Sequence, residues 1–205
     1  MHGPVKALLL DAFGTMCEIR DRRSPFVRLT RHFSDRKAWL KNTLTSRTTL
    51  ADIALKLHLS DAYMAELEKD LEAELSSITM FQDALELMTF ARRRGVRIGV
   101  VSNLAMPYGD ALRRHFPFEP DCCVWSYSVG ALKPDSRMFS TACEMLNVQA
   151  RDTLMVGDSF VCDFQGAVGF GMNALLLQRV GSPPEGIPTI RTLHEVLPVL
   201  AKTAC

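Results

Sequence analysis

Five short apolar runs lie along the chain, each followed by a polar or glycine-bearing loop. Runs of this length that end in turn-forming residues are typical of strands buried on both faces. They span residues 5–10, 96–101, 122–126, 153–156 and 173–177. Segments of helical period separate the last four runs, as at residues 82–94 and 135–146. The pattern predicts an α/β fold in which a parallel sheet has crossover helices on both faces.

The interval from about residue 16 to residue 80 breaks this alternation. No strand-like run occurs there, and about four stretches of helical period are present instead. Ser24 and Pro25 form a good N-cap and first-turn pair. Two further apolar stripes have helical spacing: Leu50, Ile53, Ala54 and Leu57, then Met64, Leu67, Leu71 and Leu75. We therefore expect an all-helical cap over residues 16–80, inserted into a core formed by residues 1–15 and 81–205.

Charge and hydropathy narrow the class of partner. The chain has 205 residues, enough for one buried core with a modest insertion. Its 24 lysines and arginines nearly balance 23 acidic residues, so no positive surplus favours nucleic acid or an anionic membrane. No run approaches the ~18 apolar residues of a membrane span. We expect a small-molecule substrate, and the sequence predicts no oligomeric state.

Cysteine usage bears on the cellular compartment. The six cysteines form no CxxC pair and have no metal-ligand spacing with histidines. The first six residues lack the apolar segment of a signal peptide. Reduced thiols and a cytoplasmic location are therefore expected. The cysteines are Cys17, Cys122, Cys123, Cys143, Cys162 and Cys205.

Polar residues follow four of the five predicted strands. Asp11 ends the first run, and open α/β sheets bind ligands at this end of their strands. Ser102 and Asn103 follow the second run, although a Ser-Asn pair alone is often only a turn. Lys133 precedes a proline after the third run, and such a pair alone is usually a solvated helix start.

The segment after the fourth run is more specific. Asp158 and Asp163 lie five residues apart beside the turn-forming Gly157. Two carboxylates so placed favour a site for a hard divalent cation, which prefers oxygen ligands. Because the predicted strands are parallel, all four polar segments should meet at one edge of the sheet.

Together, residues 8–15, 100–103, 130–134 and 155–167 resemble, in order, the four signature motifs of the haloacid dehalogenase superfamily. The resemblance implies a Rossmann-like core with a helical cap inserted after the first motif. It also implies that Asp11 is the nucleophile of a covalent aspartyl intermediate. Ser102, with Asn103 in the same motif, would hydrogen-bond the group under attack, and Lys133 would neutralise its charge. The implied Mg²⁺ ligands are Asp11, Asp158, Asp163 and the backbone carbonyl of Phe13.

The first motif departs from the pattern of the superfamily's phosphatases. These typically have a second aspartate two residues after the nucleophile, where it acts as general acid and base, and this chain has Phe13. An aromatic residue there resembles the dehalogenases, which use no Mg²⁺ and generally lack a Gly-Asp-Ser start to the fourth motif. This chain has that start, at residues 157–159.

We interpret the chain as a Mg²⁺-dependent phosphatase that acts on a small phosphorylated metabolite through an aspartyl-phosphate. One alternative is a 2-haloacid dehalogenase that uses Asp11 to form an ester. A second is a non-catalytic binding or regulatory protein of the same fold.

Several arginines lie in or near the predicted cap. A dehalogenase would need one to bind halide and carboxylate, and Arg36 and Arg47 lie in the right region. Arg20, Asp21, Arg22 and Arg23 follow the first motif, where they form either an anion clamp or a solvated linker. The linker is the simpler interpretation.

Overall fold

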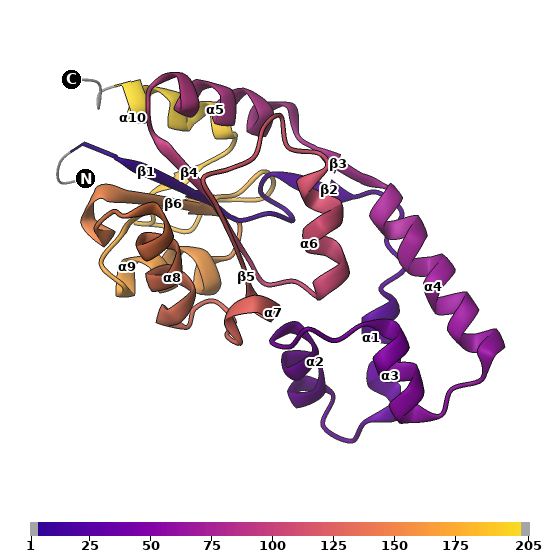
Figure 1. Ribbon diagram of the computed structural model, residues 1–205. Helices are drawn as coiled ribbons and strands as arrows, with labels where there is room; N and C mark the ends of the chain where they lie inside the picture. Colours follow the sequence, from indigo (N-terminus) through magenta and orange to yellow (C-terminus); the bar gives the residue numbers. More distant parts are fainter. Residues whose placement is uncertain (1–3, 202–205) are drawn as a thin grey trace.

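The computed structural model describes residues 4–201 and contains a six-stranded parallel sheet (Figure 1). The strand order is β5-β4-β1-β6-β7-β8. The strands are β1 (Ala7–Leu10), β4 (Arg97–Ser102), β5 (Cys122–Trp125), β6 (Thr153–Gly157), β7 (Asn173–Leu177) and β8 (Thr189–Ile190). All five predicted runs form strands, which confirms the predicted sheet. Strand β8 was not predicted because two residues are too few to form a recognisable run.

The alternation of side chains along β1 explains why helices cover both faces of the sheet. Leu8 and Leu10 belong to one buried cluster, and Ala7 and Leu9 belong to the other, because successive side chains of a strand point to opposite faces. Helices α5 (Gln82–Arg93), α6 (Met106–Arg113) and α10 (Leu197–Ala201) contribute to the first cluster. Helices α8 (Ser136–Leu146) and α9 (Gly166–Gly169) contribute to the second, so the predicted two-sided covering is confirmed (Figure 1).

The ends of the crossover helices follow local sequence rules. Gly95 has a φ of 71° after α5, the left-handed conformation in which glycine commonly ends a helix. Asp135 caps α8 by accepting a hydrogen bond from the backbone N–H of Arg137. Ser126, predicted as the end of a strand, instead begins the short helix α7 (Ser126–Val129).

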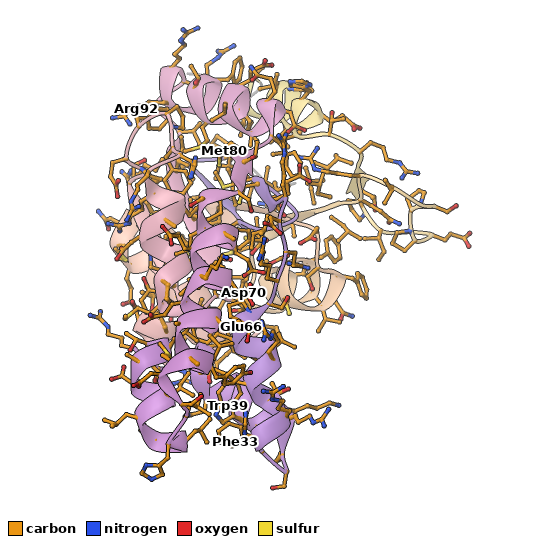
Figure 2. The ribbon with its side chains drawn as sticks, turned by 90° about the vertical axis from the view of Figure 1, so that its right-hand side faces the viewer. Phe33, Trp39, Glu66, Asp70, Met80 and Arg92 are labelled. Carbon is orange, nitrogen blue, oxygen red and sulfur yellow. The ribbon has the colours of Figure 1, made fainter. Side chains whose placement is uncertain are left out.

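Four helices occupy most of the predicted insertion and lie together beyond the sheet (Figure 1). They are α1 (Pro25–Leu29), α2 (Arg36–Leu44), α3 (Leu50–Leu57) and α4 (Asp61–Ser76). The stripe residues Leu50, Ile53 and Leu67 are buried. At the far end of this group Phe33 stacks on Trp39, with ring centroids 4.7 Å apart (Figure 2). Whether the boundaries at residues 15 and 81 separate two folding units stays a prediction.

The expectation that residues 16–80 hold no strand is wrong at both ends of that interval. Strands β2 (Cys17–Ile19) and β3 (Ile78–Met80) pair antiparallel, with Cys17 opposite Met80. The two ends of an insertion leave and rejoin the sheet close together, so their backbone groups can satisfy one another. Three residues a side are too few to show an alternating pattern.

Ser24 is the N-cap residue of α1 and Pro25 begins the helix, as predicted, but the Ser24 side chain makes no capping hydrogen bond. Ser24 has a φ of 54°. Its backbone N–H donates to the carboxylate of Glu74 instead, at 2.5 Å. A partner 50 residues away, which no local pattern reveals, therefore sets the start of α1.

Two further expectations concern the whole chain. Within residues 4–201, no helix combines the length and apolar character needed to cross a membrane. The five cysteines in that range are free thiols, whereas Cys205 lies outside the described residues. A cytoplasmic location stays a prediction.

Candidate active site

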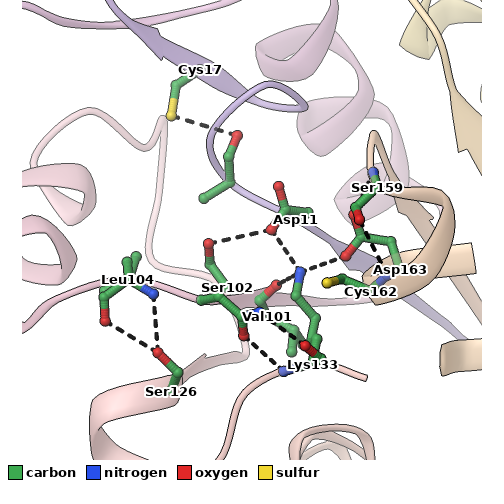
Figure 3. Close-up of polar contacts among 12 residues, drawn as sticks. Asp11, Cys17, Val101, Ser102, Leu104, Ser126, Lys133, Ser159, Cys162 and Asp163 are labelled. Atoms are coloured by element: carbon green, nitrogen blue, oxygen red, sulfur yellow. Dashed lines mark hydrogen bonds and ion pairs between the residues drawn. The ribbon is translucent and has the colours of Figure 1, made fainter. Parts of the chain in front are cut away.

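The carboxyl ends of β1, β4 and β6 bring the predicted site residues together. Leu10 at the end of β1 is in register with Val100 of β4 and with Val156 of β6. Asp11 and Ser102 therefore lie side by side (Figure 3). The segment that carries Asp158, and Asp163 in the short helix η3 (Phe160–Gln165), begins on the other side of β1. This edge of a parallel sheet is the usual place for ligand binding.

Lys133 lies at the centre of the cluster. Its ammonium nitrogen is 2.6 Å from each of three acceptors, which are Oδ1 of Asp11, Oδ1 of Asp163 and the carbonyl of Val101 (Figure 3). An ammonium group has three N–H donors, so the arrangement uses all of them. The Lys133 side chain is almost fully buried, and although burial lowers its pKa, the charges of Asp11 and Asp163 more than offset this and raise it. Lys133 is therefore a fixed positive charge.

Asp11 has one oxygen held by neighbours and one without a partner. Oδ1 accepts hydrogen bonds from Lys133 and, at 3.3 Å, from the hydroxyl of Ser102. Oδ2 accepts no hydrogen bond from any protein group within residues 4–201. Burial raises the pKa of Asp11 to about 6, with Lys133 opposing that change and the charges of Asp163 and Asp158 adding to it. The positive charge of Lys133 favours the carboxylate, which is the nucleophilic form.

Asn103 fixes the loop that carries Lys133. Its side-chain amide donates to the backbone carbonyl of Lys133 at 3.1 Å and accepts from the backbone N–H of Lys133 at 2.8 Å. This two-point contact joins the end of β4 to the segment before α8. Asn103 therefore positions Lys133, a relationship that the spacing of 30 residues in the sequence does not show.

Three carboxylates form a candidate cation site. Asp11, Asp158 and Asp163 each offer an oxygen, and these atoms lie within 4.8 Å of one another. Their three negative charges face only one ammonium group in the cluster, that of Lys133. Partial burial and the nearby charge of Asp163 raise the pKa of Asp158. Hard oxygen donors with a net negative charge are the ligands that Mg²⁺ prefers, so the residues present fit that ion.

The backbone around the carboxylates is shaped to admit them. A Cβ atom at Gly14, which has a φ of 90°, would lie 2.2 Å from Oδ2 of Asp158. A Cβ atom at Gly157 would lie 2.3 Å from the carboxylate of Asp163. Asp163 is further held by the backbone N–H of Ser159, which donates to its Oδ2 at 2.9 Å (Figure 3). Both glycines are therefore needed for the approach of the carboxylates. A ligand role for the Phe13 carbonyl stays a prediction.

Phe13 lines a cavity beside the cluster and offers no ionisable group there. Its ring is half-buried and meets the ring of Tyr108 edge-on, with centroids 6.0 Å apart. The cavity has a volume of about 320 Å³ and also contacts Asn103. The position where phosphatases of the superfamily have their general acid is therefore part of an apolar wall.

A buried carboxylate in the same cavity was not predicted from the sequence. Glu74 is 2% exposed, and it accepts hydrogen bonds from the backbone N–H groups of Arg23 and Ser24 and from the Tyr108 hydroxyl. A signal was present, because Leu67, Asp70, Leu71 and Glu74 share one helix face. Acidic residues on the apolar face of a helix indicate that their carboxylates have buried hydrogen-bond donors as partners.

Comparisons with known proteins all point to one family. The sequence pattern of the haloacid dehalogenase-like hydrolases matches residues 5–171. The human haloacid dehalogenase-like hydrolase domain-containing protein 3 is 31% identical over 178 residues, which cover 79% of this chain and 68% of that protein. Its mouse counterpart is 38% identical over 98 residues, 45% of this chain and 37% of that protein.

Two other relatives have different named activities. The (S)-2-haloacid dehalogenase 4A of Burkholderia cepacia is 26% identical, with 95% of this chain and 74% of that protein covered. A phosphoserine phosphatase of Thermus thermophilus is 31% identical, with 57% of this chain and 49% of that protein covered. These matches span between about a third and three quarters of the relatives' lengths.

Solved structures share the fold at low sequence identity. A 2-haloacid dehalogenase from Pseudomonas syringae superimposes with a TM-score of 0.70 at 19% identity, covering 98% of this chain and all of that one. A hydrolase from Bacillus subtilis bound to magnesium superimposes with a TM-score of 0.64 at 20% identity, covering 96% and 99%. Identities this low support the fold alone.

Proposed function

Because the chain belongs to the haloacid dehalogenase-like hydrolase family, we propose that it is a Mg²⁺-dependent phosphatase that acts on a small phosphorylated metabolite. The observation that carries the proposal is the position of Asp11, held by Lys133 on one oxygen and grouped with two further carboxylates. A nucleophile beside both a fixed cation and a set of cation ligands suits attack on a phosphoryl group, which is itself an anion.

The proposed reaction has two steps. Oδ2 of Asp11 attacks phosphorus, a new oxygen–phosphorus bond forms, and the bond to the leaving oxygen breaks, so that an alkoxide or phenoxide departs and takes its proton from water. Water then attacks phosphorus in the aspartyl-phosphate, which releases inorganic phosphate and restores the Asp11 carboxylate. Splitting hydrolysis in this way replaces one difficult step by two easier ones.

Lys133 and Ser102 prepare Asp11 for the first step. Both bind Oδ1, so the carboxylate cannot rotate freely and Oδ2 remains directed away from them. Since all three N–H groups of Lys133 already have acceptors, we propose that it acts through its fixed charge and by orienting Asp11. Ser102 is 3% exposed, which places its hydroxyl in an environment where a hydrogen bond is strong.

Asp11, Asp158 and Asp163 would hold Mg²⁺, with the Phe13 carbonyl as a further proposed ligand. When bound, the ion would polarise the phosphoryl oxygens and reduce the repulsion between substrate and nucleophile. The magnesium in the Bacillus subtilis neighbour and the excess of negative charge in the cluster support this assignment.

Phe13 limits the range of efficient substrates. General acid–base catalysis contributes roughly 10²–10⁴-fold to a rate, and a phenyl ring cannot supply it. Substrates that expel a stable leaving group, such as acyl phosphates and activated aryl phosphates, need this help least. The proposed enzyme is therefore expected to favour them over sugar phosphates.

The test is release of inorganic phosphate from phenyl phosphate and acetyl phosphate by purified protein. We expect release with Mg²⁺ and loss of release with EDTA, which added Mg²⁺ restores. Absence of phosphate release from both compounds and from a broad panel of phosphate esters, with Mg²⁺ present, would refute the proposal.

A dehalogenase is the second candidate, and two observations favour it. Phe13 supplies no leaving-group acid, which halide displacement does not need, and the Burkholderia cepacia relative is named as such an enzyme. The predicted arginines Arg36 and Arg47 are exposed, and neither lines the cavity beside Phe13. Release of chloride from 2-chloropropionate in the presence of EDTA would identify this activity, because the reaction requires no metal.

A further inference from the structure

The charged segment after β2 separates into paired residues and one unpaired cation. Arg20 contacts Glu18 at 3.3 Å, and Arg23 contacts Asp21 at 2.8 Å and Asp70 of α4 at 3.1 Å. Figure 2 shows Asp70 and Glu66 on α4, where both also bind Arg28. Arg22 has no hydrogen bond or ion pair within residues 4–201. Three residues of this segment are therefore paired, and the guanidinium of the fourth, Arg22, is free.

Arg22 lies on the cavity that begins at Phe13. It is the only lysine or arginine among the lining residues that the structure describes. Its positive charge also lowers the pKa of Tyr108 slightly, against the larger effect of burial, which agrees with a position close to that ring. The cavity volume of about 320 Å³ falls within the range of small-molecule pockets.

The rest of the lining is largely apolar and comes from both parts of the chain. The capping helices contribute Phe26, Val27, Leu40 and Leu44, and the sheet side contributes Phe13, Leu104 and Ala105. Such a surface gains free energy when it covers a ligand of similar character. A strongly hydrophilic body, such as a sugar, would place hydroxyl groups against these apolar side chains, which offer them no hydrogen bond.

Glu74, the acidic residue of the lining, does not neutralise Arg22. One of its oxygens accepts from the backbone N–H groups of Arg23 and Ser24, at 2.6 and 2.5 Å, and the other accepts from Tyr108. These three hydrogen bonds satisfy both oxygens of the carboxylate, and none of them comes from the Arg22 side chain. The guanidinium of Arg22 remains available to a ligand.

Two residues of the cavity lining connect it to the reacting group. Phe13 is two residues from Asp11, and Asn103 both lines the cavity and binds the backbone of Lys133. An organic group attached to a phosphoryl group at Asp11 would therefore pass over Phe13 into this space.

We propose that the substrate is a phosphate monoester with an apolar body that fills this cavity and a second anionic group, such as a carboxylate, that binds Arg22. The inference rests on the proposed phosphatase function, because it places the phosphoryl group at Asp11. Arg22, one residue of the charged run 20–23, would then determine substrate specificity.

Binding of non-hydrolysable phosphonates to the full chain with Mg²⁺, measured by calorimetry, tests this inference. Benzylphosphonate should bind about tenfold more tightly than methylphosphonate, since the phenyl group leaves water. The better of 3- and 4-carboxybenzylphosphonate should bind about tenfold more tightly again, as expected for a charge-assisted hydrogen bond. Arg22→Gln should abolish the advantage of the carboxylate. Arg20→Gln, the matched control two residues away, should keep it.

Three results would overturn the inference: no binding of any phosphonate, equal binding of the methyl and benzyl compounds, or a carboxylate advantage that survives in Arg22→Gln. Phosphate release from phenyl phosphate is measured in parallel. Phosphonate binding that depends on Arg22, without phosphate release from phenyl phosphate, acetyl phosphate or the panel of phosphate esters, would refute hydrolysis and leave the binding site in place. Phosphate release without a carboxylate advantage would refute the inference and leave hydrolysis in place.

Discussion

The ammonium nitrogen of Lys133 lies 2.6 Å from Oδ1 of Asp11, although the two residues are 122 positions apart in the sequence. The same nitrogen lies 2.6 Å from Asp163, so one buried cation separates two buried carboxylates. Breaking a buried ion pair by removing one partner leaves charge without compensation, which costs far more than the intact pair contributes. Lys133 therefore has a structural role that can be measured separately from catalysis.

Lys133→Met should lower the free energy of unfolding by about 3 kcal/mol or more, because Asp11 and Asp163 lose their shared cation. Urea unfolding in the presence of EDTA measures this without any contribution from a bound ion. The control is Lys6→Met, which breaks a 2.7 Å pair with Asp152 on a lysine whose side chain is 61% exposed. That change should cost less than about 1 kcal/mol. Equal losses in the two variants would contradict the buried-pair interpretation.

Asp11→Asn should abolish turnover and leave the fold intact. The amide is nearly isosteric with the carboxylate but is not nucleophilic, and its oxygen can still accept from Lys133. Phosphate release is compared with that of wild type, and circular dichroism checks the fold. Asp110→Asn changes an exposed aspartate on α6 in the same way and should keep full activity. Substantial turnover in Asp11→Asn would exclude Asp11 as the nucleophile.

Asp158→Ala should weaken Mg²⁺ binding and activity together, since it removes one of three carboxylates that share the candidate site. Mutating an outer-shell partner of a metal typically costs roughly 10–100-fold in affinity, and loss of a direct ligand should cost at least as much. Calorimetric titration of wild type and variant with Mg²⁺ measures the change. Unchanged affinity would mean that the ion binds elsewhere, and the dehalogenase activity would then become the better candidate.

The sheet and the site edge could be predicted because both depend on local patterns. A strand buried on two faces must be continuously apolar, as at Leu8, Leu9 and Leu10. The residue that follows such a strand lies at the carboxyl edge of the sheet, and this position does not depend on the rest of the chain. The order of strands then brings Asp11, Ser102 and Asp158 to one place, so their proximity required only the parallel arrangement to be correct.

The features that the sequence did not predict depend on contacts between distant segments. Glu74 is buried because Ser24, Arg23 and Tyr108 converge on it from two other elements, and Ser24 adopts its conformation in return. Strands β2 and β3 are too short to have a periodicity of their own. The different environments of Arg20 and Arg22 likewise depend on which side chains the fold brings near them.

The Asp83–Arg179 pair predicts a pH dependence of stability. Arg179 binds both oxygens of Asp83, at 2.9 and 3.0 Å, and the backbone N–H of Leu193 adds a third hydrogen bond. Burial alone would raise the pKa of Asp83, but these donors outweigh it and lower that pKa. The stabilisation is therefore fully present above the unfolded pKa of about 3.9 and is lost as the pH falls through the lower folded value.

Asp83→Asn should accordingly lower the free energy of unfolding by about 2 kcal/mol at neutral pH. The difference between wild type and variant should stay constant above about pH 5 and shrink below about pH 4. Urea titrations at a series of pH values measure it. A difference that grows as the pH falls would have the wrong sign for a depressed pKa and would contradict the assignment.

Phe13 offers the sharpest test of the proposed chemistry. If the site is a phosphatase site without a proton donor, wild-type kcat/KM should fall steeply as the pKa of the leaving group rises, because nothing protonates a departing alkoxide. Phe13→Asp would place a carboxyl group beside the reacting atoms and raise the rate for alkyl phosphates selectively, toward the roughly 10²–10⁴-fold that acid–base catalysis supplies.

Phe13→Asn is the matched control, since it removes the same ring contact with Tyr108 but donates no comparable proton. Both variants lose apolar packing, so a rate gain confined to Phe13→Asp would identify proton transfer as its cause. Equal changes in the two variants, or a flat dependence on the leaving group in wild type, would show that the missing acid does not limit this enzyme.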